Sequence, residues 1–304
     1  MVLVLGGTRF LGRHIVEALA ASGHEVTCFH RGNARCALPA GVREIFGDRN
    51  DPLPPELRAQ WDAVVDVSGQ QPQQVERSRE LESARYLFIS TLNVYADLSQ
   101  PGTGEDAATV ETYDESDPAA AYGGRKAACE RLVLERYDDR ATILRPGIIA
   151  GVWDYTERLT YWPRHALRGG RFEVPAPPER PLQFIDARDL AAFAVRAIQR
   201  KIGGIFNTVA PAEPYSLGEF ARACAEAAGE RGVRAEPLFV SAETLIARGV
   251  EPWTDIPMWL EDSAFAGLFQ TSNARALAVG LQPRPPIDTA RALMDWIGSA
   301  PVTR

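Results

Sequence analysis

Short apolar runs alternate with amphipathic stretches through the first half of the chain. The first run, Val2 to Leu5, has no polar residue, and such runs are typical of strands that a parallel sheet buries on both faces. Runs rich in apolar residues predict strands over residues 2–5, 25–30, 42–46, 63–67, 86–90 and 141–144. Apolar residues at helical spacing predict helices over residues 10–21 and 122–136. This alternation predicts an α/β fold with a doubly wound parallel sheet, because strand–helix–strand units join parallel strands.

The second half of the chain has a different pattern. Residues 151–184 are rich in Trp, Pro, Gly and Arg and show no regular alternation. Further elements are predicted afterwards, namely a helix over residues 186–201, a strand over 205–209, and helices over 216–228, 272–279 and 287–297. We therefore expect a sheet domain over residues 1–150, to which the chain returns at about 184–210. A smaller C-terminal, substrate-binding lobe is expected from residues 151–183 and 211–304.

Composition limits the partners of the protein more than its fold. Hydrophobic residues make up 45% and charged residues 24% of the chain, which is ordinary for a globular protein. The net charge of −7 disfavours general binding of nucleic acid or of an anionic membrane. No apolar run approaches the roughly 18 residues of a membrane span, and no basic leader precedes the first strand. Because the four cysteines show no paired spacing, we expect reduced thiols and a cytoplasmic protein.

A glycine-containing turn lies between the first predicted strand and the first helix. It reads GGTRFLG from residue 6 to residue 12. Glycine permits a close approach of the backbone, and the free N–H groups of a helix N-terminus attract a pyrophosphate. Because the turn opens a strand–helix–strand unit, it predicts a Rossmann-type dinucleotide-binding domain in residues 1–150. We expect the cofactor to contact Gly6, Thr8, Arg9, Phe10, Leu11 and Gly12.

A tyrosine and a lysine lie four residues apart in the helix predicted over residues 122–136. Residues at this spacing share one helix face, so the ammonium of Lys126 can lie near the phenol of Tyr122. A nearby cation, together with a positive nicotinamide ring, lowers the pKa of a phenol from about 10 towards working pH. A tyrosinate can then take the proton of a carbinol while hydride leaves for the cofactor. By itself the pair also fits two solvated side chains on a helix; together with the dinucleotide-binding turn it predicts hydride transfer at a secondary alcohol or ketone carbon.

These two motifs resemble those of the extended short-chain dehydrogenase/reductases, also called the NAD(P)-dependent epimerase/dehydratase family. Gly6, Phe10 and Gly12 match the glycine turn of that family, whereas Arg9 stands at the position of its middle glycine. The resemblance is firm over residues 1–150 and looser afterwards. It implies a Rossmann-type sheet domain and an NAD(P)-dependent enzyme.

The resemblance also implies a role for three side chains. Tyr122 would act as the catalytic acid or base, and Lys126 would bind the cofactor ribose and tune Tyr122. Thr91, three residues before a Val-Tyr pair, would polarise the reacting carbonyl. Leu92 and Asn93 stand where the dehydratases of the family have an acid pair, so elimination is not expected.

Further cofactor contacts follow from the same resemblance. Asp48 corresponds to the residue that contacts adenine. Ser68 and Gly69 correspond to the small residues beside a ribose, and Pro146 and Ile148 lie in the segment that lines the nicotinamide site.

The end of the second predicted strand indicates the type of cofactor. An acid at this position binds the ribose hydroxyls of NAD, but here the strand ends in His30 and Arg31. Arg31, with Arg9, can neutralise a ribose 2′-phosphate. We therefore expect NADP(H) in preference to NAD(H).

The substrate half lacks a phosphate-binding pattern. Nucleotide-sugar members of the family hold a pyrophosphate with two arginines, but Leu182 occupies one position and no Arg-x-Gly-Asp run precedes the final helices. Arg180 or Arg164 could take their place. Aromatic residues instead gather over residues 153–172 and 253–269. Packed aromatics belong to a core more often than to a ligand site, but any that line the cleft would favour a flat or apolar substrate, or a ring with C–H faces.

Three functions stay open on the sequence alone. The leading hypothesis is an NAD(P)-dependent oxidoreductase or epimerase that transfers hydride on a small-molecule substrate. The second is a nucleotide-sugar epimerase with rearranged phosphate contacts. The third is a non-catalytic cofactor-binding or RNA-binding protein on the same fold. No metal site is expected, and a homodimer is implied by the resemblance alone.

Overall fold

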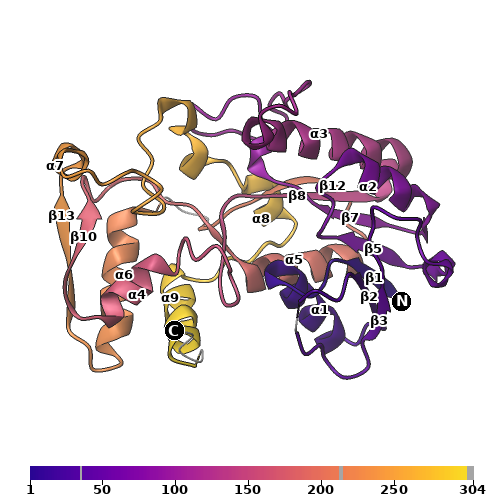
Figure 1. Ribbon diagram of the computed structural model, residues 1–304, viewed down its shortest axis with the longest axis horizontal. Helices are drawn as coiled ribbons and strands as arrows, with labels where there is room; N and C mark the ends of the chain where they lie inside the picture. Colours follow the sequence, from indigo (N-terminus) through magenta and orange to yellow (C-terminus); the bar gives the residue numbers. More distant parts are fainter. Residues whose placement is uncertain (35, 212–214, 300–304) are drawn as a thin grey trace.

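Seven parallel strands form the central sheet of the protein (Figure 1). The computed structural model describes residues 1–34, 36–211 and 215–299. Across the sheet the order is β12 (Gly204–Thr208), β8 (Ala141–Pro146), β7 (Tyr86–Ile89), β5 (Ala63–Asp66), β1 (Val2–Leu5), β2 (Val26–His30) and β3 (Arg43–Phe46). Each of these strands was predicted to within two residues at either end. The predicted α/β fold with a doubly wound, Rossmann-type parallel sheet is confirmed.

Alternate residues of each central strand face opposite sides of the sheet. In β1, Val2 and Val4 belong to one buried cluster, and Leu3 and Leu5 belong to another. Because β1 supplies both cores, all four of its positions carry buried apolar side chains. This is why continuous apolar runs, rather than alternating ones, predict the central strands of this chain.

Helices cover both faces of the sheet (Figure 1). α1 (Phe10–Ala21) and α5 (Ala187–Gln199) pack on one face, whereas α2 (Pro72–Arg77) and α3 (Pro118–Tyr137) pack on the other. The side chain of Asp186 begins α5 by accepting a hydrogen bond from the backbone N–H of Arg188. A short helix near the end of the chain, α8 (Ala274–Ala278), adds Ala276 to the core beneath α1 and α5.

A second hydrophobic core lies beside the sheet, in the part of the chain that follows β8 (Figure 1). Its elements are α4 (Tyr161–Leu167), α6 (Leu217–Gly229), α7 (Ala242–Ala247), α9 (Pro286–Ser299) and a parallel pair of strands, β10 (Gly170–Pro175) and β13 (Ala235–Val240). Trp162, Phe220 and Trp259 are fully buried in this core. Sequence patterns predicted α6 and α9, but α4, α7, β10 and β13 were missed.

Two short parallel pairs complete the described strands. They are β4 (Gln60–Trp61) with β6 (Glu82–Ser83), and β9 (Ile149–Ala150) with β11 (Ile185–Asp186). The second pair brings together the points where the chain leaves the sheet domain and where it returns. In residues 1–34, 36–211 and 215–299, no helix combines the length and the apolar character that crossing a bilayer requires.

Candidate active site

A cavity of about 1010 Å³ opens at the carboxyl ends of the sheet strands, the edge where doubly wound sheets bind their ligands. One end is formed by the glycine turn and by the residues that follow β2 and β3. The middle is lined by residues after β5, β7 and β8 and by α3. Loops of the second core, around residues 155–158 and 253–268, form the other end. The cavity therefore joins the sheet domain to the C-terminal part of the chain.

The glycine turn has the shape that a bound phosphate requires. Gly6 has a φ of +93°, and a Cβ atom on Gly12 would lie 2.1 Å from the carbonyl oxygen of Gly6. Arg9, at the position of the missing middle glycine, has an extended backbone with φ −127° and ψ 144°, a conformation open to any residue. Its side chain does not cap α1. Phe10, Leu11 and Gly12, in the first turn of this helix, line the cavity, and no side chain caps the helix there, an arrangement that suits pyrophosphate binding.

One end of the cavity, which we call the adenosine end because the family resemblance places adenine there, carries an exposed cation beside a carboxylate. The side chain of Arg31 is 63% exposed, and its Nη1 atom lies 3.8 Å from Oδ2 of Asp48. The other carboxylate oxygen of Asp48 accepts a hydrogen bond from the backbone N–H of Asn50 at 2.8 Å. His30, which ends β2, is held by Glu44 at 2.8 Å. Arg31 and the exposed Arg9 are therefore the two guanidinium groups at this end that can meet a phosphate.

A buried ion pair lies under the middle of the cavity. Arg49 follows β3 and meets Asp66, the last residue of β5, through two hydrogen bonds of 2.5 and 2.9 Å. The hydroxyl of Tyr86 donates a third hydrogen bond to the same carboxylate at 2.8 Å. Burial by itself raises the pKa of Asp66, but Arg49 and Tyr86 outweigh it, so the pKa of this carboxyl is lowered. Asp66 is therefore held ionised although it is fully buried.

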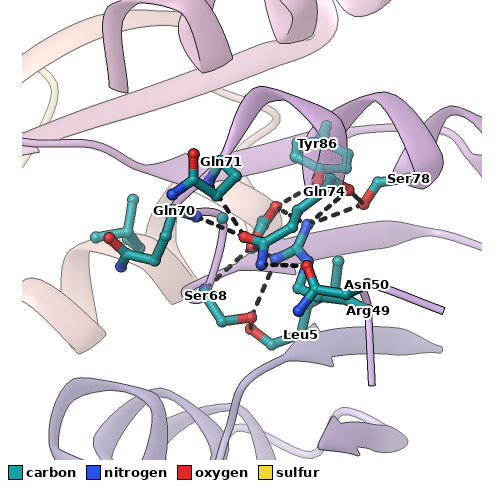
Figure 2. Close-up of polar contacts among 12 residues, drawn as sticks. Leu5, Arg49, Asn50, Ser68, Gln70, Gln71, Gln74, Ser78 and Tyr86 are labelled. Atoms are coloured by element: carbon teal, nitrogen blue, oxygen red, sulfur yellow. Dashed lines mark hydrogen bonds and ion pairs between the residues drawn. The ribbon is translucent and has the colours of Figure 1, made fainter. Parts of the chain in front are cut away.

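The ion pair orders the wall of the cavity (Figure 2). Arg49 also donates hydrogen bonds to the hydroxyl of Ser68 at 3.0 Å, to the carbonyl of Gln74 at 3.1 Å and to the hydroxyl of Ser78 at 3.1 Å. Ser68 in turn donates to the carbonyl of Leu5 at 3.1 Å, immediately before the glycine turn. Arg49 thus connects the residues after β1, β3 and β5. Sequence reasoning missed it, because its partner lies in a different strand.

Lys126 is the most deeply buried cation of the site. Its Nζ donates hydrogen bonds of 2.7 Å to the carbonyl oxygens of Gly69 and Ile89, and it lies 4.0 Å from the centre of the Phe88 ring. The residue is 1% exposed, and burial lowers the pKa of its ammonium to about 8. Two of the three N–H donors of Lys126 are thus committed to the backbone. One donor remains for a hydroxyl group in the cavity.

Tyr122 and Thr91 lie together on the same wall. The oxygen of Thr91 accepts a hydrogen bond from the backbone N–H of Asn93 at 3.2 Å, and Thr91 also shares a side-chain hydrogen bond with Tyr122. Burial raises the pKa of the Tyr122 phenol, and this effect outweighs the opposing hydrogen bond with Thr91. The lowered phenol pKa expected from the spacing of Tyr122 and Lys126 is therefore wrong for the protein without cofactor. Burial opposes ionisation, and Lys126 is fixed on two backbone carbonyls.

We expect this pKa to respond to the cofactor. In the protein alone, the phenol of Tyr122 should ionise above pH 10, because burial disfavours the charged form. Saturation with the oxidised cofactor brings a positive ring into the cavity and should lower this pKa. The difference in phenolate absorbance between the unchanged protein and Tyr122→Phe, recorded against pH, isolates this one tyrosine. A pKa that is below 10 without cofactor, or that rises when cofactor binds, would contradict this assignment.

Two groups of aromatic residues in the C-terminal part differ in their surroundings. Trp162 and Trp259 belong to the second core, as the more common role of packed aromatics predicts. Tyr155, Trp253 and Phe265 instead line the cavity, beyond Tyr122 as seen from the glycine turn. Of these two groups the second lines this cavity, and its Trp253 also packs against the second core.

The sequence of the sheet domain decides the family. Residues 2–72 and 73–208 match the NAD dependent epimerase/dehydratase family, which is more than half of the chain. The chain belongs to this family. The resemblance stated from the glycine turn and the Tyr-x-x-x-Lys spacing is thereby confirmed.

Relatives in the epimerase/dehydratase family have diverse descriptions. The chain is 30% identical over 251 residues to the chloroplast stem-loop binding protein of 41 kDa b of Arabidopsis thaliana. The aligned region covers 75% of this chain and 63% of that protein. It is 28% identical over 276 residues to an epimerase family protein of Bos taurus, with coverage of 82% and 85%. The chain thus spans less than two thirds of the length of the plant relative.

Solved structures confirm the fold of the epimerase/dehydratase family. UDP-glucuronic acid 4-epimerase from Bacillus cereus in complex with NAD superimposes with a TM-score of 0.69, covering 97% of this chain and 96% of that chain at 17% identity. At this identity the likeness concerns the architecture alone.

The cavity brings together most of the residues that the sequence and the family resemblance indicate. All of them line it except Gly69. Gly69 acts from behind the wall, where its carbonyl holds Lys126. Among the described residues no group of three His, Cys, Asp or Glu side chains is placed to hold a metal ion. The turn, the uncapped helix start and the free donor of Lys126 fit the nicotinamide dinucleotide that names this family.

Proposed function

We propose that this protein is an oxidoreductase or epimerase that transfers hydride between a nicotinamide cofactor and a secondary alcohol or ketone carbon of a small molecule. The observation that supports this proposal is that one cavity contains both the glycine turn and the three candidate catalytic residues. Its glycine turn lies at one end, and Thr91, Tyr122 and Lys126 lie on its middle wall. A substrate held between Tyr122 and the C-terminal loops would therefore meet the cofactor and the acid/base residue together.

Each side chain has a separate task in this proposal. The cofactor supplies or accepts the hydride. Tyr122 takes the proton from the carbinol oxygen during oxidation and returns it during reduction. Thr91 donates a hydrogen bond to the same oxygen, and Lys126 holds a ribose hydroxyl with its remaining donor. Oxidation, reduction and epimerisation through a transient ketone all use this set.

The reaction can be tested directly with purified protein. The absorbance of the nicotinamide band is followed with NADP(H) and with NAD(H) across a panel of ketones, secondary alcohols and nucleotide sugars. A change in this band with any member supports hydride transfer. Cofactor binding without turnover or epimerisation across the panel would contradict it.

The cofactor is proposed to be NADP(H). Arg31, with Arg9 on the same end of the cavity, offers a guanidinium for the 2′-phosphate, and β2 ends without an acid. The contact between Arg31 and Asp48 is long, at 3.8 Å, so a phosphate can replace it.

Arg31→Ala is expected to weaken NADP(H) binding about tenfold and to change NAD(H) binding less than about twofold, because only the first cofactor carries a 2′-phosphate. Calorimetric titration measures both affinities. Arg43→Ala is the matched control, since Arg43 is exposed on the neighbouring strand β3 and does not line the cavity. Tighter binding of NAD(H) than of NADP(H) by the unchanged protein would refute the preference.

The similarity to a plant stem-loop binding protein favours one alternative, an RNA-binding protein on the same fold. The net charge of −7 argues against it, because phosphate backbones are bound by basic surfaces. A homodimer and a cytoplasmic location stay predictions from the sequence.

A further inference from the structure

The end of the cavity beyond Tyr122 has a wall of its own. We call it the cavity mouth and define it by Tyr155, Arg158, Trp253, Asp262 and Phe265, all of which line the cavity. Tyr155 is 73% exposed and Phe265 is 40% exposed, which is unusual for large aromatic side chains. Exposed aromatic residues that surround a cavity are typical of a ligand-binding surface.

The two segments that form the mouth, residues 151–160 and 251–265, are strained. Trp153, Glu157, Trp253 and Met258 have φ values of 67°, 53°, 65° and 71°. These are four of the seven non-glycine residues with positive φ in the described part of the chain. Such strain costs about 1–3 kcal/mol per residue and gathers at functional sites. Two segments with a strained backbone therefore form the mouth, as is typical of functional sites.

Buried and half-buried polar contacts hold the two segments in place. In the first segment, the buried carboxylate of Asp154 accepts hydrogen bonds from the backbone N–H and the hydroxyl of Thr156 at 2.8 and 2.6 Å. In the second, Glu261 pairs with Arg180 at 2.6 Å and accepts a hydrogen bond from the indole of Trp259 at 2.5 Å. Arg180 is thus committed to loop structure, and it does not line the cavity.

Arg158 is the cation that the mouth leaves available. Its guanidinium carbon lies 5.5 Å from the centre of the Trp253 ring. Among residues 1–34, 36–211 and 215–299 it forms no ion pair or hydrogen bond, whereas the nearby Arg164 pairs with Glu157 at 2.9 Å. The charge of Arg158 also acts on the phenol of Tyr122, which places it within electrostatic range of the proposed reacting atoms.

A single guanidinium limits what the mouth can bind. A diphosphate is usually held by two fixed cations, but the other arginines of the cavity, Arg9, Arg31 and Arg49, lie at its adenosine end and under its middle. Leu182, at one family arginine position, is fully buried, and neither Arg164 nor Arg180 lines the cavity. The carboxylate of Asp262 can accept hydrogen bonds from hydroxyl groups, and aromatic faces can pack against C–H groups.

We propose that the cavity mouth recognises a hydroxylated ring that carries one anionic substituent, a carboxylate or a phosphate monoester, bound by Arg158. Trp253 and Phe265 pack against the apolar faces of this ring, and Asp262 accepts hydrogen bonds from its hydroxyl groups. This inference rests on the proposed function, because it names the substrate class of the same cavity.

The test compares one ring with different substituents. Protein saturated with NADPH is titrated calorimetrically with glucose, glucuronate, glucose 1-phosphate and UDP-glucose, and with the galactose counterparts. We expect glucuronate, glucose 1-phosphate or a galactose counterpart of either to bind at least about tenfold tighter than the neutral sugar. The two anionic arms distinguish a carboxylate from a phosphate. The diphosphate-linked sugar should bind no tighter than the better of them.

Variants at Arg158 separate its charge from its shape. Arg158→Gln should reduce the preference for the anionic ring to within about twofold, and Arg158→Lys should keep part of it. Arg164→Gln is the matched control, because its guanidinium is exposed on the helix after the first segment and lies outside the cavity. Its titrations should match those of the unchanged protein.

Several outcomes overturn the inference. They are equal affinity for neutral and anionic rings, a preference that survives in Arg158→Gln, binding of the UDP-sugar at least about tenfold tighter than the monoester, or no binding of any ring. The cofactor titration that precedes these measurements distinguishes the two levels of failure. If neither NADPH nor NADH binds, the proposed function fails. If NADPH binds and the rings are not distinguished, only this inference fails.

Discussion

Replacing Tyr122 with phenylalanine is expected to lower turnover by about 10²-fold or more, while cofactor affinity stays within about twofold of the unchanged protein. Phenylalanine keeps the ring that packs on the cavity wall and removes only the hydroxyl that exchanges the proton. Steady-state rates on any substrate found in the panel, together with calorimetric cofactor titration, measure the two quantities separately.

Tyr137→Phe provides the control for this variant. Tyr137 lies at the end of the same helix, α3, and its buried hydroxyl has no hydrogen-bond partner in the described structure. The same chemical change there should leave turnover unaltered. If Tyr122→Phe retains full turnover, Tyr122 is not the acid/base residue. If the unchanged protein itself shows no turnover on any substrate of the panel, a non-catalytic binding protein becomes the better hypothesis.

The largest expected effect on stability comes from the ion pair under the cavity. Arg49→Met should lower the free energy of unfolding by about 3–5 kcal/mol, because it leaves the fully buried carboxylate of Asp66 without its cation. Urea denaturation measures this change. Arg79→Met breaks partly exposed ion pairs with Glu76 and Glu135 and should cost less than about 1 kcal/mol.

Two further measurements distinguish a buried charge from general disruption. The double variant Arg49→Met/Asp66→Leu should recover part of the loss, since it leaves no charge buried alone. Because the pKa of Asp66 is lowered in the folded protein, the unfolded chain binds this proton first as the pH falls. The stabilisation is therefore present above about pH 4 and is lost below it. A double variant that is no more stable than Arg49→Met would count against this account.

The sheet was predictable because its strands obey local rules. A strand such as β1 supplies both cores with apolar side chains, and the glycine turn after it is specified by adjacent residues. β10 and β13 do not follow such a rule. They form a parallel pair whose members are 60 or more residues apart and only partly buried, as in the alternating exposure of Ala235–Val240. Their pairing depends on a core that other segments build.

The same distinction applies to the candidate site. Tyr122 and Lys126 were found because their spacing on one helix is a local property. Arg49 and Asp66 were missed because nothing in the local sequence pairs them until β3 and β5 are placed in the sheet. The environment of the Lys126 ammonium was also not predictable, since it depends on two backbone carbonyls from other segments, Gly69 in the loop after β5 and Ile89 at the end of β7.

The route of the chain affects how the protein can be divided. β12 pairs with β8 at one edge of the sheet, and α5 lies against α1, yet both follow residue 184. A fragment that stops at residue 150 would therefore lack its outermost strand and half of one helical layer. On a ribosome, the cofactor-binding half could not reach its final form until more than 200 residues had emerged. Protease cleavage in the loops between residues 150 and 184 should therefore leave two fragments that stay associated, because both contribute to the same sheet.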